Sequence, residues 1–170
     1  KKPMAEIREK KVSRLSHVDK AGRARMVDVS DKDVTHRVGV ARGRIVMKPE
    51  TLALIVGRKV DKGDVFAVAR VGGIMAAKKT RELIPMWHPL NISAVEISLT
   101  AREKPARVEI EATVRVSGKT GVEMEAMTAV AVCALTIYDM CKAVDREMSL
   151  EAVRLMQKSG GKSGTFTRSK

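Results

Sequence analysis

Acidic and basic side chains stand at both ends of an apolar segment, residues 117–144. Glu123 and Glu125 lie near its start, and Asp139 and Lys142 lie near its end. Side chains three residues apart on a helix are neighbours, so the Asp–Lys pair fits either proton exchange at an active site or an ordinary surface ion pair. The two glutamates share one face if the chain is extended there, and are otherwise solvated carboxylates at a helix start. The apolar surroundings predict burial, and burial can shift the pKa of an acid.

A histidine and a lysine elsewhere in the chain are also candidates for chemistry. His88 lies between Pro85 and Pro89, in a loop stiff enough to aim its side chain. Histidine exchanges protons near neutral pH, although a hydrogen-bonded structural histidine is the commoner case. Lys62 lies just before a predicted helix start and is either an anion contact or an exposed turn lysine.

Two glycine-rich stretches resemble phosphate-binding loops in part. A strict P-loop needs a Gly five residues before its Gly-Lys pair, but residues 117–121 have Thr113 at that position and residues 160–164 have Met156. Neither stretch is therefore a P-loop. Each could still offer backbone N–H groups and a lysine to an anion, or be an ordinary turn.

The cysteines and histidines do not form a metal-binding pattern. Cys133 and Cys141 would lie about 12 Å apart along one helix, which is beyond disulfide distance, so we expect reduced, buried thiols. His17 and His36 have no ligand-like spacing to His88 or to the cysteines, and we expect no metal site.

The charge of the chain favours anionic partners. Its 33 Lys and Arg against 20 Asp and Glu give a net charge of +13 and a pI near 10.1. Nucleic acid is the first candidate by charge, but single-strand binders usually stack bases on several aromatic rings, and this chain has only four. A small phosphorylated substrate explains the charge equally well.

Nothing in the sequence predicts a membrane segment or a secretion signal. The longest uncharged run in the apolar segment is residues 126–138, shorter than the ~20 residues that span a bilayer. The basic start has no apolar region behind it. We expect a cytoplasmic protein with a flexible basic arm at residues 1–14 and one domain at residues 15–170.

The periodicity of the sequence predicts an α+β fold of ferredoxin-like type, with helices packed on one face of an antiparallel β-sheet and extra N-terminal strands. Predicted strands cover residues 24–30, 35–47, 92–101 and 106–117, with a break at Gly43 that would turn the second into a hairpin. Predicted helices cover residues 48–56, 65–83 with Asp64 as N-cap, 125–139, and 150–157 after Ser149. The glycine-rich tail, residues 158–170, is expected to be mobile.

Five blocks of the sequence together resemble the cyclic pyranopterin monophosphate synthase family, the accessory proteins C of molybdenum cofactor biosynthesis. These blocks are residues 26–30, 62–70, 73–90, 118–145 and 158–164. They follow the family's order, and the resemblance extends from about Leu15 to Phe166. It implies a lyase that takes a cyclised dihydroguanosine triphosphate, releases pyrophosphate and forms cyclic pyranopterin monophosphate. No redox cofactor is implied, and a divalent ion could accompany the triphosphate.

The resemblance also implies which residues form the site. Eight positions match the family's active-site residues: Lys62, His88, Glu123, Met124, Glu125, Asp139, Lys142 and Lys158. The expected catalytic residues are Asp139, Lys142, Lys62 and His88, and the expected substrate contacts are Met86, Trp87, His88, Glu123, Met124, Glu125 and Lys158. Position 87 departs from the family, since Trp stands where Cys is common.

The predicted long helix separates the two groups of candidate residues. Glu125 and Asp139 would lie about 21 Å apart along its axis, too far to contact one small nucleotide. A second subunit must therefore contribute one end, which agrees with the homo-hexamer, a trimer of dimers with sites between subunits, that the resemblance implies. Two other classes stay open: a basic nucleic-acid-binding module, and a non-catalytic assembly domain built on the apolar helix.

Overall fold

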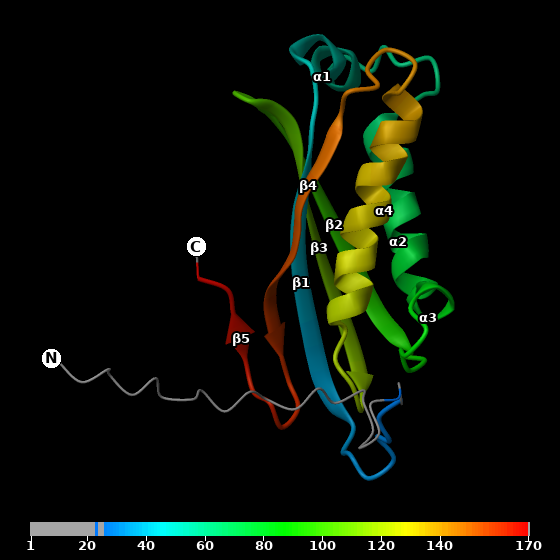
Figure 1. Ribbon diagram of the computed structural model, residues 1–170, viewed down its shortest axis with the longest axis vertical. Helices are drawn as coiled ribbons and strands as arrows, with labels where there is room; N and C mark the ends of the chain where they lie inside the picture. The colour runs from blue at the N-terminus through cyan, green and yellow to red at the C-terminus, as the bar shows by residue number, and fades with distance from the viewer. Residues whose placement is uncertain (1–22, 24–25, 170) are drawn as a thin grey trace, which may run out of the picture.

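The computed structural model describes residue 23 and residues 26–169. Five strands form one antiparallel sheet in the order β2-β3-β1-β4-β5, and helices α2 and α4 cover one of its faces (Figure 1). The elements are β1 (Thr35–Val46), α1 (Pro49–Val56), α2 (Val65–Lys78), α3 (Thr80–Leu83), β2 (Ile92–Glu103), β3 (Ala106–Gly118), α4 (Glu123–Cys141), β4 (Ser149–Ser159) and β5 (Phe166–Thr167). The predicted α+β, ferredoxin-like arrangement is confirmed.

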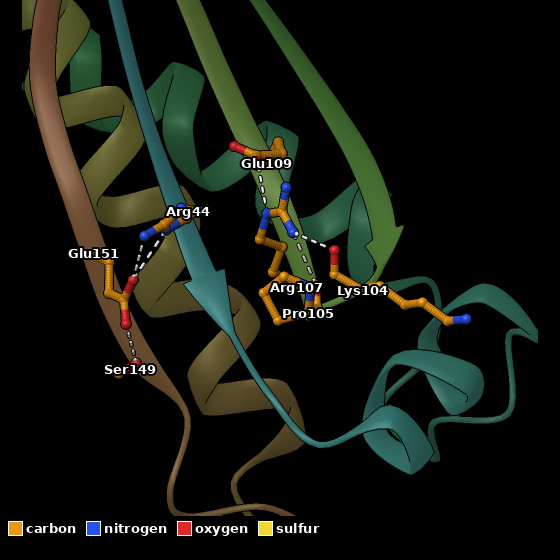
Figure 2. A network of polar contacts seen from close by, with 7 residues as sticks. All are labelled: Arg44, Lys104, Pro105, Arg107, Glu109, Ser149 and Glu151. Atoms are coloured by element: carbon orange, nitrogen blue, oxygen red, sulfur yellow. Dashed lines mark hydrogen bonds and ion pairs between the residues drawn. The ribbon is translucent and has the colours of Figure 1, made fainter.

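The two faces of the sheet differ in composition because side chains alternate along each strand. In β3 every second residue from Val108 to Val116 is buried beneath the helices, and the residues between them face the other way. That outer face carries ion pairs, two of which Figure 2 shows: Arg44–Glu151 and Arg107–Glu109. The hydrophobic core therefore lies on the helix side of the sheet only.

Helix α4 is the central element of the core. It is long and apolar enough to cross a membrane by length and composition, yet half of its most apolar window is buried inside the protein, as in a core helix. Glycines let the neighbouring elements come close to it. A Cβ at Gly73 of α2 would lie 3.0 Å from the carbonyl oxygen of Ala129, and one at Gly43 of β1 would lie 2.7 Å from Val130 Cγ1.

Several predicted elements are present where expected. Helix α1 has Pro49 in its first turn and ends before Gly57. Asp64 caps α2, since its Oδ1 accepts a hydrogen bond of 3.0 Å from the N–H of Ala67. Strands β2 and β3 form the predicted antiparallel pair. The predicted helix at residues 65–83 is interrupted at Lys79, which divides it into α2 and α3.

The predicted helix after Ser149 is wrong, because these residues form strand β4 beside β1. Leu150 pairs with Ile45, but two register shifts follow, and Ala152 has a φ of +52°. A β-bulge inserts an extra residue and moves the following side chains to the other face. The bulge brings Val153 against the core side of Gly43, where its Cγ2 would lie 3.1 Å from an added Cβ. Apolar residues three apart, which resemble a helical pattern, thus belong to one bulged strand.

Three further predictions, for β1 and for the two ends of the chain, differ from the structure or fall partly on residues that the structure does not describe. Strand β1 continues through Gly43, which pairs with Ile110, so no hairpin forms there. The predicted extra strand at 24–30 is absent from its described part, residues 26–30, and residues 24–25 lie outside the description, as does the predicted arm at 1–14. Part of the predicted mobile tail is ordered into the end of β4 and into β5.

Asp145 joins the end of α4 to the start of α1. Its Oδ2 accepts hydrogen bonds from the N–H of Lys48 at 2.9 Å and from Thr51 Oγ1 at 3.1 Å, and its Oδ1 accepts one from the N–H of Glu147 at 3.1 Å. Burial opposes ionisation of this carboxyl, but the hydrogen bonds outweigh it and hold the pKa of Asp145 below its ordinary value. The carboxylate therefore fixes the part of the fold that carries Lys142.

We predict that Asp145→Asn lowers the free energy of unfolding by about 1–3 kcal/mol near neutral pH, because the amide cannot accept all three hydrogen bonds. A depressed folded-state pKa gives stability that is present above the unfolded pKa of about 3.9 and is lost as the pH falls through the folded value. The difference in free energy of unfolding between the unaltered protein and Asp145→Asn should thus become smaller in acid. Urea unfolding at several pH values measures this difference, with the exposed Asp61→Asn as control. A difference that does not depend on pH contradicts the anchoring role of the Asp145 carboxylate.

Candidate active site

A cavity of about 740 Å³ lies at the N-terminal end of α4. Segments far apart in the sequence supply its walls: residues before and in β1, Trp87, the two glycine-rich stretches, and the first turn of α4. The lining residues are Lys32, Asp33, Thr35, Arg37, Val38, Trp87, Lys119, Thr120, Gly121, Glu123, Met124, Lys158, Ser159, Gly160, Gly161, Lys162 and Ser163. Most of its charged side chains are basic, so the cavity suits an anionic ligand.

Both glycine-rich stretches contribute to this cavity although neither is a P-loop. Gly160 and Gly161 have φ values of +96° and +74°, and a Cβ at Gly160 would lie 2.2 Å from the carbonyl oxygen of His36. Only glycine fits such a conformation at such a distance. Lys158 Nζ donates to Ser163 Oγ across the same turn. The turn thus places a lysine and a hydroxyl beside the cavity.

Glu123 faces the cavity beside a lysine. Its Oε1 lies 3.8 Å from Lys158 Nζ, and both side chains are about one quarter exposed. Gly121 makes room for this carboxylate, because a Cβ there would lie 1.9 Å from Glu123 Oε2. The first turn of α4 thus presents a paired acid and base to the cavity, an arrangement that can bind a polar ligand or move a proton.

Glu125 lies in the same helical turn as Glu123 but is buried, whereas Glu123 is partly exposed. Glu125 is 3% exposed, and its Oε1 accepts a hydrogen bond from the indole N–H of Trp87. Its Oε2 is buried without a hydrogen-bond partner among the described residues. Burial raises the pKa of Glu125 to about 7, the hydrogen bond from Trp87 opposes the rise, and the charge of Glu123 adds to it. Glu125 can therefore gain or lose a proton near neutral pH.

A second polar group, Lys62, Asp139 and Lys142, lies at the C-terminal end of α4. Asp139 Oδ1 lies 2.7 Å from Lys142 Nζ, and its Oδ2 lies 3.3 Å from Lys62 Nζ. Lys62 Nζ also donates to the backbone carbonyl of Asp139 at 2.9 Å. The neighbouring ammonium groups, that of Lys142 first, hold the pKa of Asp139 below its ordinary value. The predicted burial of this acid is wrong, because Asp139 is 59% exposed, and its pKa is lowered by the lysines instead of shifted by burial.

The structure divides the predicted site residues into two groups and leaves two apart. Trp87, Glu123, Met124 and Lys158 line the cavity, with Glu125 buried beside them, whereas the Lys62–Asp139–Lys142 group lies about 21 Å away along one continuous helix. Met86 and His88 lie half-buried in the loop of Trp87 but do not line the cavity. No hydrogen bond or ion pair links His88 to another residue in the described part of the chain.

Arg37 is a cavity residue that the sequence reasoning missed. Its Nε donates to the carbonyl of Gly118 at 2.8 Å and its Nη2 to that of Lys119 at 3.1 Å, so it ties β1 to the first glycine-rich stretch. A signal was available in the sequence. Arg37 has the same parity along β1 as the buried residues from Gly39 to Ile45, and an arginine at an inward position calls for a functional or structural reason.

The described residues offer no evident metal site. Within residue 23 and residues 26–169, no group of three or more His, Cys, Asp or Glu side chains could hold a metal ion. Both cysteines are free and buried, as predicted, and burial raises the pKa of the Cys133 thiol to about 12.

Comparison with known proteins gives the family. The MoaC family model matches residues 26–161, which is most of the chain. The chain belongs to the MoaC family. Among its relatives, the cyclic pyranopterin monophosphate synthase of Pelotomaculum thermopropionicum is 62% identical over 157 residues, covering 92% of each chain. Those of Chloroflexus aurantiacus and Brevibacillus brevis are 62% and 58% identical and cover 91% of this chain and 94% and 96% of theirs. The resemblance stated from the sequence blocks is confirmed.

For this MoaC-family chain we predict that Lys142→Met raises the pKa of Asp139 toward its ordinary value, because the largest cause of the lowering is removed. Lys62→Met should raise it less. Carboxyl ¹³C NMR titration of Asp139 measures both shifts, and Lys59→Met, an exposed lysine in the same loop as Lys62, is the control. An unchanged midpoint in Lys142→Met would show that this ion pair does not set the charge of Asp139.

Proposed function

We propose that the two polar groups at the ends of α4, the cavity residues at its start and Lys62, Asp139 and Lys142 at its end, belong to one active site formed between two copies of the chain. This site converts a cyclised dihydroguanosine triphosphate to cyclic pyranopterin monophosphate with release of pyrophosphate. The family membership and the relatives at about 60% identity make the chain a cyclic pyranopterin monophosphate synthase, a lyase of molybdenum cofactor biosynthesis.

The observation that carries the proposal is the separation of the two polar groups. Helix α4 runs without interruption from Glu123 to Cys141, and an α-helix rises about 1.5 Å per residue. Glu125 and Asp139 therefore cannot contact one small nucleotide within a single chain. A second copy whose Asp139 end meets the cavity of the first brings both groups to one substrate, and a symmetric pair then contains two such sites.

The surface between the two polar groups supports packing against another copy. Val68, Val71 and Met75 of α2 and Leu135 of α4 are each about half exposed, with exposed fractions between 45% and 56%. The two helices adjoin here, because Gly72 lies against Thr136. Exposed apolar residues that gather on one face are typical of subunit interfaces. We propose a cytoplasmic homo-oligomer, a hexamer built as a trimer of dimers.

Each polar group has a separate task in this reaction. Pyrophosphate release develops negative charge on the leaving group, and the lysines and backbone N–H groups around the cavity, Lys158 among them, stabilise that charge. Lys62, Asp139 and Lys142 from the second copy move protons between ring and ribose atoms, with His88 from the loop beside the cavity. Trp87 and Met124, which line the cavity, give the base an apolar surface, and Met86 adds to it from the same loop only where the second copy completes the site. A divalent ion can accompany the triphosphate.

The direct test is incubation of the protein with the cyclised triphosphate and measurement of pyrophosphate and of the pterin product. Release of both in equal amounts supports the proposal. Release of neither by a folded, fully assembled protein contradicts it, and salt-dependent binding to unrelated RNA or DNA would then favour a nucleic-acid-binding role.

Shared sites predict complementation between inactive variants. Glu125→Gln and Asp139→Asn chains are each expected to be inactive alone, but random mixing of unfolded and refolded chains should leave about one quarter of the sites with both native residues. Activity should recover to a corresponding fraction of the unaltered protein. The control mixes Glu125→Gln with Glu123→Gln chains, whose changes fall in the same half of the site and cannot complement. Hetero-oligomers verified by mass that recover nothing would exclude sharing.

The two polar groups should also differ in kinetic effect. Lys158 anchors phosphate in ground and transition states alike, so Lys158→Ala should raise KM and weaken its salt dependence, with a smaller loss in kcat. Asp139→Asn keeps the shape of the side chain but removes its proton exchange, and should lower kcat by about a hundred-fold or more while KM changes little. Steady-state kinetics with matched protein concentrations measure both. Near-normal turnover in Asp139→Asn would assign the proton transfer to Glu123, Glu125 or His88 instead.

A further inference from the structure

We propose that Trp87 is a positioning residue for Glu125. Its indole N–H binds one carboxyl oxygen of Glu125 and leaves the other, buried beside the cavity, without a partner among the described residues. Trp87 thereby sets the protonation state in which Glu125 meets the substrate. This inference rests on the proposed function for its catalytic consequence, but the Trp87–Glu125 pair itself is a feature of the chain without ligand.

The geometry of the pair supports this assignment. The indole N–H of Trp87 reaches Glu125 Oε1 from a loop 38 residues away in the sequence, and the carboxyl is 3% exposed. Oε2 has no hydrogen-bond partner among the described residues. A buried oxygen without a partner is unfavourable and calls for an explanation. A hydrogen bond that forms when substrate binds, with Oε2 as donor or acceptor, provides one.

The charges around the pair leave Trp87 as the main group that stabilises the carboxylate. Glu123 is nearest along α4, and its negative charge opposes ionisation of Glu125. From β4, Lys158 pairs with Glu123, and from β1, Arg37 donates to backbone carbonyls at residues 118 and 119. His88 shares the loop of Trp87, and no polar contact joins it to Glu125 among the described residues. Burial therefore raises the pKa of Glu125, and the indole N–H limits that rise.

A purely structural role for Trp87 is the alternative. An indole that only fills space would stabilise the loop, and its removal would lower stability without moving a titration. A positioning role moves a titration, because a hydrogen bond to the ionised carboxylate favours that form. The two roles are therefore separated by the pH dependence of the pair and not by loss of activity.

Trp87 is the only tryptophan in the chain, so tryptophan fluorescence reports on this pair directly. A titration of the assembled protein without substrate should show a change in emission with a midpoint at about pH 7, the value to which burial raises the pKa of Glu125. Glu125→Gln should abolish the change. Glu123→Gln should keep it but move the midpoint to lower pH, because a charge that opposes ionisation is removed. The same transition in Glu125→Gln, or none in the unaltered protein, overturns the proposal.

Kinetics then test the catalytic consequence. Trp87→Phe keeps a ring and removes the N–H, so the limb of the kcat/KM pH profile whose midpoint matches the fluorescence titration should move upward by about one pH unit, the size expected for one hydrogen bond to a charged group. Trp87→Gln restores a donor and should move the limb back. Circular dichroism and mass measurement check that both variants fold and assemble. An unmoved limb in folded Trp87→Phe overturns the positioning role.

The activity assay and the fluorescence titration distinguish failure of the proposed function from failure of the role of Trp87. A protein that releases no pyrophosphate from the cyclised triphosphate contradicts the proposed function, yet the fluorescence titration still reports whether Trp87 senses the charge of Glu125. A protein that turns over substrate but lacks the titration contradicts only the role of Trp87.

Discussion

The rigid length of α4 is the constraint on which the rest of the structure depends. The helix packs along the sheet from Glu123 to Cys141, close to β1 and α2 because Gly43 and Gly73 carry no side chain to hold it off. A helix that packs one face against the core along its length and contains no proline or inserted residue keeps its ends a fixed distance apart. The chain therefore presents a cavity with mostly basic charged residues at one end of the helix and an acid between two lysines at the other. The helix positions both groups with precision but cannot bring them together, so the proposed shared site requires a second copy for a reason that lies in backbone geometry.

The acids on this helix and just after its end show how environment divides one chemical group among several roles. Asp139 is exposed beside two ammonium groups, which favour the carboxylate. Glu125 is buried, and burial favours its neutral form. Asp145 is buried as well, but three hydrogen bonds keep it ionised and make it a structural anchor. Environments that separate pKa values in this way are typical of sites that carry out acid and base steps at one pH.

The fold was predictable where local signals agree with tertiary packing. Pro49 and Asp64 mark helix starts through their own backbone and side-chain chemistry, and the alternation in β2 and β3 reflects a sheet with one buried face. The prediction failed at β4, where a bulge at Ala152 sets Leu150 and Val153 on the core side and imitates a helical period. It failed at Gly43 for a similar reason, since that glycine serves contact with Val130 and not a turn. In both places the deciding contact comes from another element.

The sequence by itself determined the family, the candidate site residues and the length of α4, and hence the distance between the two polar groups, because residue types and helical rise are local properties. Only the tertiary structure decided that the two incomplete phosphate-loop stretches, around Lys119 and Lys162, open onto one cavity, and that Arg37 belongs to it. Likewise only the structure decided that Glu125 is buried against Trp87 while Glu123, two residues away, is partly exposed. These outcomes depend on contacts between residues far apart along the chain, and burial and hydrogen bonding at such contacts are set when the sheet, the loop and the helix pack together.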